Sequence, residues 1–216
     1  MNESRAFFDR IAARYDRAYA ISGATSRALN DALCAILCAP KRILDLGVGT
    51  GRELTALREA GHTTVGLEIA PEMIALCNKR AHPIPITLGD LWAEWPFEAS
   101  TFDAVIALHG TLAHPPAEAA LADFFANARR VLAKGGIIVA ELPTPAWLDH
   151  AHGSASLAPT NEDGIATARF TDEVNGARIT IRLFDETRWR AAARGFALEF
   201  QSIGDAEVRF VAREVG

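Results

Sequence analysis

The chain has 216 residues with a formal net charge of −5; half of its residues are hydrophobic and 23% are charged. This composition supplies a sizeable apolar core and excludes a globally disordered or low-complexity protein. The acidic balance argues against broad binding to nucleic-acid backbones, because that affinity depends mainly on Lys and Arg. The three cysteines are too few for a disulfide framework and indicate a reducing compartment. Because we find neither a signal peptide nor an apolar run long enough to cross a membrane, we expect a cytoplasmic protein without a membrane partner.

The first 40 residues are predicted to form two amphipathic helices. Apolar residues recur at helical spacing over residues 4–20, and residues 21–23 break this helix. The second helix is predicted to begin at a cap formed by Thr25 or Ser26 and to end at Pro40. We expect residues 1–40 to form a helical cap on the rest of the domain.

From residue 42 onward, short apolar runs alternate with helical segments. The predicted strands cover residues 42–46, 63–68, 83–88, 102–108 and 136–142. The predicted helices cover residues 52–60, a segment that begins at Pro71, and residues 116–133. Apolar strands that alternate with helices predict a parallel sheet covered by helices.

The last third of the chain has a different pattern. Residues 143–163 are predicted to be a long irregular segment, followed by a hairpin of strands 166–170 and 178–183 with Asn175 and Gly176 in its turn. A helix over 187–194 and a final hairpin of strands 196–203 and 207–215 complete the chain. We therefore predict one domain over residues 1–216, in which residues 143–184 form a loop and hairpin insertion over the substrate site.

The most specific motif lies between the first strand and the following helix. Gly47, Gly49 and Gly51 would let the backbone approach a ligand closely at the carboxyl end of that strand. A dinucleotide-binding motif would require glycine where the chain has Arg52, and the Gly-Lys-Ser/Thr sequence of a phosphate-binding loop is absent. Asp45, two residues before the first glycine, suits a cationic group of the ligand instead.

Two more acidic residues follow neighbouring strands. Glu68 ends the second strand, where a carboxylate can accept hydrogen bonds from both ribose hydroxyls. Asp90 follows the third strand, where its carboxylate can reach an exocyclic amine. Together with the glycine motif, these acids indicate a site for a nucleoside that carries a positive charge and no phosphates.

These motifs resemble those of the class I S-adenosylmethionine-dependent methyltransferases that act on small molecules. The resemblance extends from Phe7 to the C-terminus and includes residues 7–16, 45–51, 89–91, 101–103 and 132–136. It implies a Rossmann-like α/β fold with a seven-stranded, mostly parallel sheet in the order 3-2-1-4-5-7-6, an antiparallel last strand and helices on both faces.

The resemblance also implies S-adenosylmethionine as cofactor and S-adenosylhomocysteine as product. The residues implied in binding it are Asp45, Gly47, Gly49, Gly51, Glu68, Asp90 and Leu91, and the resemblance favours Tyr15 as a further contact. One departure is Ala70, where the family commonly has a helix-capping Ser, Thr or Asp; this affects helix stability more than function.

Four histidines fall near the expected substrate side. His109 and His114 follow the fourth strand, whereas His150 and His152 lie in the segment after the fifth strand. Any of them could accept a proton from a hydroxyl or ammonium nucleophile, and the alternative is that they are loop residues without a chemical role. The spacing of His150 and His152 would also allow metal binding, but we expect no metal site. Trp147 and Phe170 are candidates to line an apolar pocket.

The sequence therefore predicts an enzyme that methylates an oxygen or nitrogen atom of a small molecule by in-line displacement. The segment Leu108–Leu112 lacks the motif of enzymes that methylate nucleobase amines, so we expect no nucleic-acid partner. A binding or regulatory protein with the same fold and no turnover is the alternative, and a nicotinamide-dependent oxidoreductase is disfavoured by the glycine spacing. We expect a monomer or a homodimer.

Overall fold

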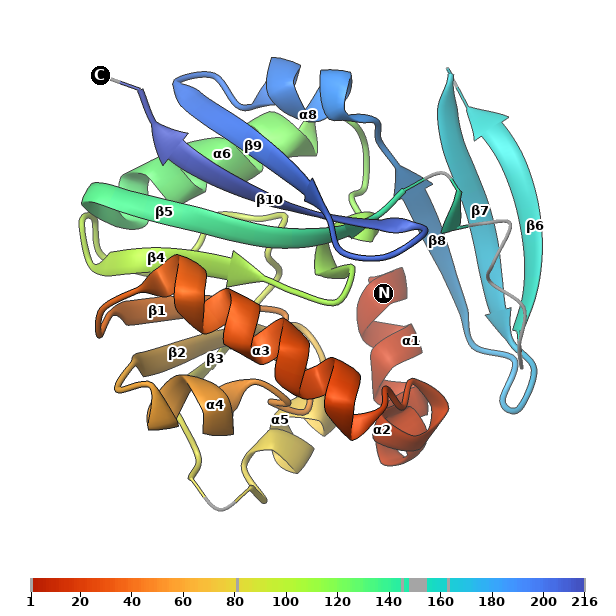
Figure 1. The fold of residues 1–216 in the computed structure, drawn as a ribbon. Helices are drawn as coiled ribbons and strands as arrows, with labels where there is room; N and C mark the ends of the chain where they lie inside the picture. Colours follow the sequence, from red (N-terminus) through yellow and green to blue (C-terminus); the bar gives the residue numbers. More distant parts are fainter. Residues whose placement is uncertain (1, 81, 145, 148–154, 163, 216) are drawn as a thin grey trace.

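The computed structural model describes residues 2–80, 82–144, 146–147, 155–162 and 164–215 (Figure 1). In these ranges the main sheet has seven strands in the order β3-β2-β1-β4-β5-β10-β9. Their bounds are β1 Arg42–Leu46, β2 Thr63–Glu68, β3 Ile86–Leu88, β4 Phe102–Ala107, β5 Leu132–Pro143, β9 Phe196–Ser202 and β10 Glu207–Glu214. Strands β1 to β5 pair in parallel, and β10 runs antiparallel between β5 and β9. The predicted order is confirmed, since three inserted strands only shift the numbers of the last two.

Helices cover both faces of this sheet, as predicted (Figure 1). One face carries α3 (Gly23–Leu37), α4 (Leu54–Glu59) and α5 (Pro71–Cys77), and the other carries α6 (Ala120–Val131) and α8 (Glu186–Ala192). Leu44 of β1 and Val105 of β4 pack with Phe125 of α6, whereas their neighbours Ile43 and Ala104 pack in a second cluster with α3 and α4. This alternation follows from the two-residue period of a strand and explains why the strands are apolar on both faces.

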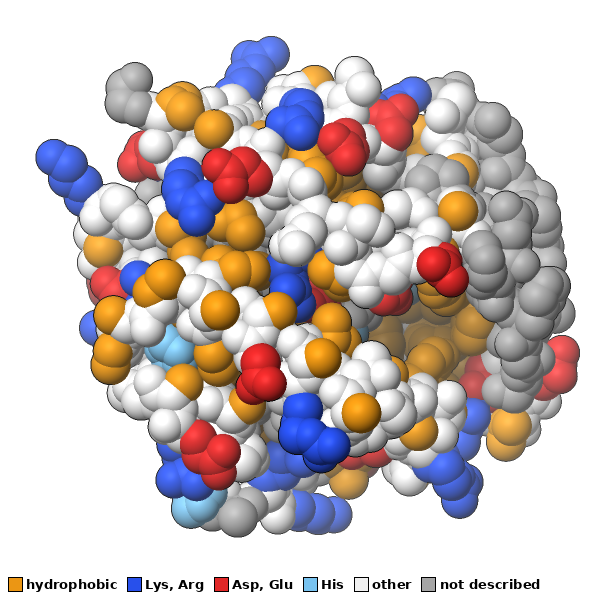
Figure 2. Space-filling view, in the orientation of Figure 1, with side chains coloured by type: hydrophobic (Ala, Val, Ile, Leu, Met, Phe, Trp, Pro, Cys, Tyr) orange, Lys and Arg blue, Asp and Glu red, His pale blue; other side chains and the backbone are white. Residues whose placement is uncertain are grey.

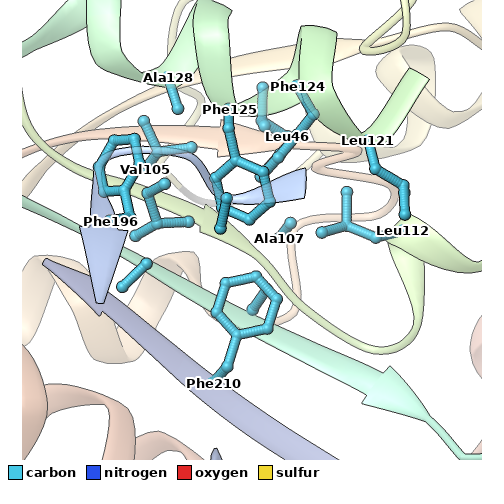
Figure 3. Packing of buried hydrophobic residues seen from close by; sticks show 14 of the residues in the cluster. Leu46, Val105, Ala107, Leu112, Leu121, Phe124, Phe125, Ala128, Phe196 and Phe210 are labelled. Atoms are coloured by element: carbon cyan, nitrogen blue, oxygen red, sulfur yellow. The ribbon is translucent and has the colours of Figure 1, made fainter. Parts of the chain in front are cut away.

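The larger cluster is built around aromatic rings. Figure 3 shows Phe125 pointing from α6 toward the sheet and Phe210 of β10 lying opposite it. The centroids of the two rings lie 6.3 Å apart, and Trp189 of α8 lies 5.6 Å from Phe210. Burial of such side chains stabilises the fold by about 1.5–3 kcal/mol each. Phe210 therefore anchors β10 in the core, next to β5 in the main sheet.

The N-terminal segment differs from the single helix predicted over residues 4–20. Helix α1 (Glu3–Ile11) is followed by a 3-10 turn (Ala12–Arg14) and the short helix α2 (Tyr15–Ala18). Arg14 leaves the helical region with φ −123° and ψ 0°, and the residues that follow it include Asp16, which contacts Thr50 and Arg52 between β1 and α4. Helix α3 begins at Gly23 rather than after Thr25 or Ser26, because the Ser22 hydroxyl accepts a hydrogen bond from the backbone N–H of Thr25.

The insertion forms a second sheet in the order β6-β7-β8, from β6 (Ala155–Glu162), β7 (Ile165–Asp172) and β8 (Arg178–Leu183). The predicted hairpin is present, but β6 was expected to be irregular. Pro159 is compatible with β6 because this strand lies at the edge of its sheet, where proline is tolerated. The turn is wider than two residues: the Asp172 carboxylate accepts hydrogen bonds from the backbone of Val174 and Asn175.

The remaining differences concern element ends. Helix α6 is shorter than the predicted 116–133, and β3 begins only after the prolines at positions 83 and 85. Strand β5 begins at Leu132, earlier than predicted, and its register against β4 shifts between Phe102 and Ala104. A second 3-10 turn (Thr111–Ala113) follows β4. Within the described ranges, the structure has no helix that is both long and apolar enough to span a bilayer.

Candidate functional site

Two adjoining pockets lie at the carboxyl ends of β1, β2 and β4, the end of the sheet where ligands of open α/β folds bind. The first, about 660 Å³, is called the glycine pocket and is lined mainly by Gly47, Gly49, Glu68, Ile69, Met73, Gly89, Asp90, Leu91 and Trp92. The second, about 1300 Å³, is called the aromatic pocket and is lined mainly by Phe7, Phe8, Tyr19, Ile21, Trp147, Phe170, Ile179, Ile181 and Glu207. The two share Phe8, Tyr15, His109, Gly110 and His114. A ligand of one pocket is therefore next to a ligand of the other.

The glycine loop between β1 and α4 requires its glycines for two different reasons. Gly47 and Gly51 have φ of +66° and +72°, and a Cβ added to Gly47 would lie 2.6 Å from Cγ2 of Thr111. Gly49 has φ +53°, but its nearest neighbouring atom would be 3.7 Å from an added Cβ. Gly47 is thus limited by space as well as by conformation, and Gly49 chiefly by conformation.

Glu68 connects this loop to the end of β2. Its Oε2 accepts a 2.8 Å hydrogen bond from the N–H of Gly49, and its Oε1 accepts 2.9 Å bonds from Ile69 and Ala70. Burial raises the pKa of Glu68, and the three backbone hydrogen bonds partly offset that rise. A carboxylate oxygen can accept two hydrogen bonds, so Oε2 retains capacity for a ligand in the glycine pocket. The sequence identifies this residue as a ligand contact but does not reveal that it also holds the loop.

Asp45 lines a smaller pocket that shares Gly47 and Gly49 with the glycine pocket, and one of its carboxylate oxygens is unpartnered. Its side chain is 3% exposed, and Oδ2 has no hydrogen-bond partner. Burial raises the pKa of Asp45 well above its usual value, and the negative charges of Glu53 and Glu68 raise it further. A buried polar atom without a partner is costly, and a ligand that donates a proton or carries positive charge would remove that cost. The residue therefore fits the cationic ligand group that the sequence suggests.

Asp90 and Leu91 reach the glycine pocket from the segment after β3. Oδ1 of Asp90 accepts a 2.9 Å hydrogen bond from the N–H of Trp92, and Oδ2 accepts a 2.8 Å bond from the side-chain amide of Asn2. The start of the chain thus lies against this side of the pocket. No local motif points to Asn2, because it is 88 residues away from Asp90 in the sequence.

Tyr15 lines both pockets and lies beneath Arg52, whose guanidinium carbon is 5.0 Å from the ring centroid. Burial raises the pKa of Tyr15 to about 12, so its hydroxyl stays protonated. The next residue, Asp16, accepts a 2.6 Å hydrogen bond from the hydroxyl of Thr50 and a 3.1 Å bond from Arg52. Arg80 also reaches Asp16, at 3.3 Å. These contacts hold the N-terminal segment over the glycine loop, and the sequence analysis did not identify them.

His109 is held between two carboxylates. Its Nε2 makes a short hydrogen bond to Glu53, its Nδ1 lies 3.8 Å from Oε2 of Glu141, and its backbone N–H donates to the same oxygen at 3.2 Å. Burial alone would lower the pKa of His109, but the hydrogen bond and charge of Glu53, with Glu141, outweigh it and raise the pKa. Glu141 is also paired with Arg209, which is 2% exposed. Since both ring nitrogens face glutamates, His109 is poorly placed to accept a proton from a ligand.

His114 has the opposite environment. Its Nδ1 donates a 3.2 Å hydrogen bond to the carbonyl oxygen of Thr180, and its ring packs edge-on against Phe8 with centroids 5.7 Å apart. Burial lowers the pKa of His114 to about 4, so the ring is neutral at neutral pH and Nε2 is left as an acceptor. His150 and His152, the other two predicted candidates, lie outside the described residues.

Comparisons with known proteins agree with this geometry. Residues 43–136, which contain the glycine loop, Glu68 and Asp90, match the family model described as a methyltransferase domain. The chain is 37% identical to a demethylmenaquinone methyltransferase of Thermus thermophilus over 147 residues, which are 64% of this chain and 65% of that protein. It is 34% identical to an 18S rRNA (guanine-N(7))-methyltransferase of Bos taurus over 126 residues, 55% of this chain and 44% of that protein. The chain thus spans less than two thirds of the length of both relatives.

A similar fold is found in the crystal structure of the PH0226 protein from Pyrococcus horikoshii, with a TM-score of 0.75 and 21% identity. That likeness covers 94% of this chain and 99% of the other. The similarity in fold therefore extends well beyond residues 43–136.

Proposed function

We propose that the chain is a class I S-adenosylmethionine-dependent methyltransferase that methylates an oxygen or nitrogen atom of a small molecule. The methyltransferase-domain match over residues 43–136 and the similarity to a demethylmenaquinone methyltransferase support this proposal. S-adenosylmethionine supplies a methyl group that is activated by the positively charged sulfur to which it is bonded. The acceptor atom would attack this methyl group in line with the carbon–sulfur bond, and that bond would break to leave S-adenosylhomocysteine. The observation that carries the proposal is the unpartnered, buried Oδ2 of Asp45, in a pocket that shares Gly47 and Gly49 with the glycine pocket.

We assign the cofactor to the glycine pocket. Glu68 would accept hydrogen bonds from the ribose hydroxyls, Asp90 with Leu91 would contact the adenine, and Asp45 would face the positive charge of the amino-acid part. Gly47 and Gly49 line this pocket and allow the backbone to approach the ligand, and Tyr15 closes the pocket from the N-terminal side. Gly51 would act only through the loop, because a Cβ added there would lie 2.7 Å from Sγ of Cys77. The acidic lining supports a cationic nucleoside and disfavours a phosphorylated one.

We assign the acceptor to the aromatic pocket, because it adjoins the glycine pocket along Tyr15, His109 and His114. Rate enhancement would come chiefly from alignment of the acceptor atom with the methyl group and from exclusion of water by the apolar walls. His114, which is neutral with Nε2 unprotonated, is the better candidate to accept a hydrogen bond from the acceptor. His109 would act by holding the end of β4 in place.

A nucleic-acid acceptor is the second candidate, raised by the similarity to the bovine rRNA methyltransferase. The net charge of −5 and the apolar lining of the aromatic pocket favour a small molecule over RNA. The location is part of the same proposal: we expect a cytoplasmic monomer or homodimer, and the free thiols of Cys34, Cys38 and Cys77 are compatible with that compartment.

Calorimetry with S-adenosylmethionine, S-adenosylhomocysteine and NADH tests the cofactor assignment, and the variant Asp45→Asn tests its physical basis. The substitution removes a buried charge, so we expect the unliganded protein to unfold at a higher temperature while its affinity for S-adenosylmethionine falls at least about tenfold. Asp205→Asn, at an exposed turn, is the matched control and should change neither quantity. Unchanged affinity in Asp45→Asn, or tighter binding of NADH, would contradict the assignment. Methyl transfer from labelled cofactor to metabolite mixtures and to total RNA then separates the two acceptor classes.

A further inference from the structure

The walls of the aromatic pocket are contributed by segments that lie far apart in the sequence. Phe8 and Tyr19 come from the N-terminal segment, Trp147 follows β5, and Phe170 and Ile179 come from the inserted sheet. Figure 2 shows a hollow whose visible floor is hydrophobic, with acidic side chains beside it. Such a surface binds an apolar or aromatic body and excludes water from it.

One charged side chain in this pocket has no partner in the described part of the chain. Among the described residues, the charged side chains that line the pocket are Arg52, Glu141, Glu207 and His109, whose pKa is raised by Glu53 and Glu141. Arg52 is already paired with Asp16, and Glu141 is already paired with Arg209. Glu207, the first residue of β10, is left with no hydrogen bond or ion pair to its carboxylate from any described residue. It is therefore the charge that an acceptor would have to satisfy.

The surroundings of Glu207 also favour an acceptor that pairs with its carboxylate. Much of the Glu207 side chain is exposed to solvent, but it is partly buried at the pocket. This burial raises the pKa of Glu207, and the negative charge of Glu141 raises it further. The neighbouring His109 partly offsets both effects. An anionic acceptor would face the unpaired carboxylate of Glu207, and a neutral acceptor would leave that carboxylate unpaired. A cation would pair with Glu207, and aromatic faces along the walls would favour it further.

We propose that the acceptor is a small, ring-bearing molecule with a basic amine, and that Glu207 binds this amine as an ammonium group while the apolar body fills the aromatic pocket. This inference rests on the proposed function, since it assigns the chemistry of the second substrate in the same site. The ammonium group serves recognition, so the atom that receives the methyl group is not fixed by it. Glu207 is a specificity-determining residue in this proposal.

The test uses three probes that share one ring and differ in charge: 2-phenylethylamine, 2-phenylethanol and 3-phenylpropanoate. Binding of each is measured by NMR titration of the protein saturated with S-adenosylhomocysteine. We expect the amine to bind about tenfold more tightly than the alcohol, and the carboxylate to bind most weakly. Glu207→Gln should reduce the preference for the amine to less than about twofold and leave alcohol binding unchanged. Glu214→Gln lies on the same strand outside the pocket and should keep the parent preference.

Each outcome decides the matter. Binding of S-adenosylhomocysteine is measured before any probe is added, and failure of this ligand to bind contradicts the proposed function. If that ligand binds but the three probes bind equally, or none binds, the acceptor class proposed here is wrong. A preference for the amine that persists in Glu207→Gln likewise overturns the role of Glu207. Loss of the preference in both glutamate variants would also contradict the proposal, because it would reflect overall charge rather than this residue.

Discussion

The carboxylate of Asp16 accepts a 2.6 Å hydrogen bond from the hydroxyl of Thr50, and this contact joins the N-terminal segment to the glycine loop. Arg52 and Arg80 converge on the same carboxylate, at 3.1 and 3.3 Å. The two sides of the glycine pocket are therefore mechanically connected. Movement of the N-terminal segment should change the position of the loop that we assign to the cofactor.

Replacement of Asp16 by Ala should loosen this connection. The Asp16 side chain is 55% exposed, so solvent screens its ion pairs, and we expect a loss of only about 1 kcal/mol in the free energy of unfolding. The loss of binding free energy for S-adenosylmethionine should exceed this loss of unfolding free energy. The rate of hydrogen exchange should rise over residues 3–18. Asp31→Ala, an exposed position on α3, is the control. Unchanged exchange over that segment would show that Asp16 does not hold it.

Gly47 and Gly49 should respond differently to the same substitution. Gly47→Ala places a methyl group 2.6 Å from Cγ2 of Thr111, so it should abolish binding of S-adenosylmethionine and cost about 1–3 kcal/mol of stability. Gly49→Ala meets no atom closer than 3.7 Å and should cost about 1–2 kcal/mol, because of its positive φ. Calorimetry and thermal unfolding measure both effects.

A second substitution distinguishes steric from conformational causes. Thr111→Ser removes Cγ2 and keeps the hydroxyl that donates a 2.8 Å hydrogen bond to the carbonyl oxygen of Leu108. Combined with Gly47→Ala, it should restore part of the lost binding, whereas it should not improve Gly49→Ala. Equal binding by the two single alanine variants would contradict the steric argument.

The sequence predicts the parts of the site that depend on local pattern. The glycine motif, Glu68 and Asp90 each follow a short apolar strand, and a parallel sheet brings its strand ends together, so their meeting in one pocket follows from topology. Ser22 was missed as a helix cap because Thr25 and Ser26 are equally suitable by type. The break at Arg14 was missed because it serves contacts of Asp16 with residues more than thirty positions away.

The charged network around His109 could not be predicted for the same reason. Glu53 directly precedes α4, whereas Glu141 lies in β5 and Arg209 lies in β10, so no local sequence pattern connects the three residues. Only the three-dimensional structure shows that Glu53 and Glu141 hold the two sides of one imidazole ring. Strand β6 is a similar case, since an edge strand accepts a proline that normally argues against a strand.

His109 should make stability depend on pH in the neutral range. Its folded pKa is raised above the unfolded value of about 6.5, so its contribution is fully present below that pH and is lost as pH rises through the folded pKa. His109→Asn, chosen because Asn tolerates the φ of +52°, should remove this dependence. Unfolding free energies at pH 6 and pH 9 for parent and variant measure it, with exposed His82→Asn as the control. If the difference in unfolding free energy between parent and variant is the same at both pH values, His109 is not held charged by Glu53 and Glu141.

His114 should titrate in the opposite direction. Its folded pKa of about 4 lies below the unfolded value, so its stabilising contribution is complete above about pH 6.5 and is lost as pH falls toward 4. NMR of the imidazole should therefore show a neutral ring at pH 5.5, with Nδ1 protonated by its bond to Thr180. His114→Gln should lower kcat for the acceptor while affinity for S-adenosylmethionine changes less than about twofold. The contrary result would be a parent kcat that falls as pH is lowered, with a midpoint near pH 6.5, and a loss of this pH dependence in His114→Gln. The ring would then titrate as an ordinary histidine, and the low pKa inferred for it would be wrong.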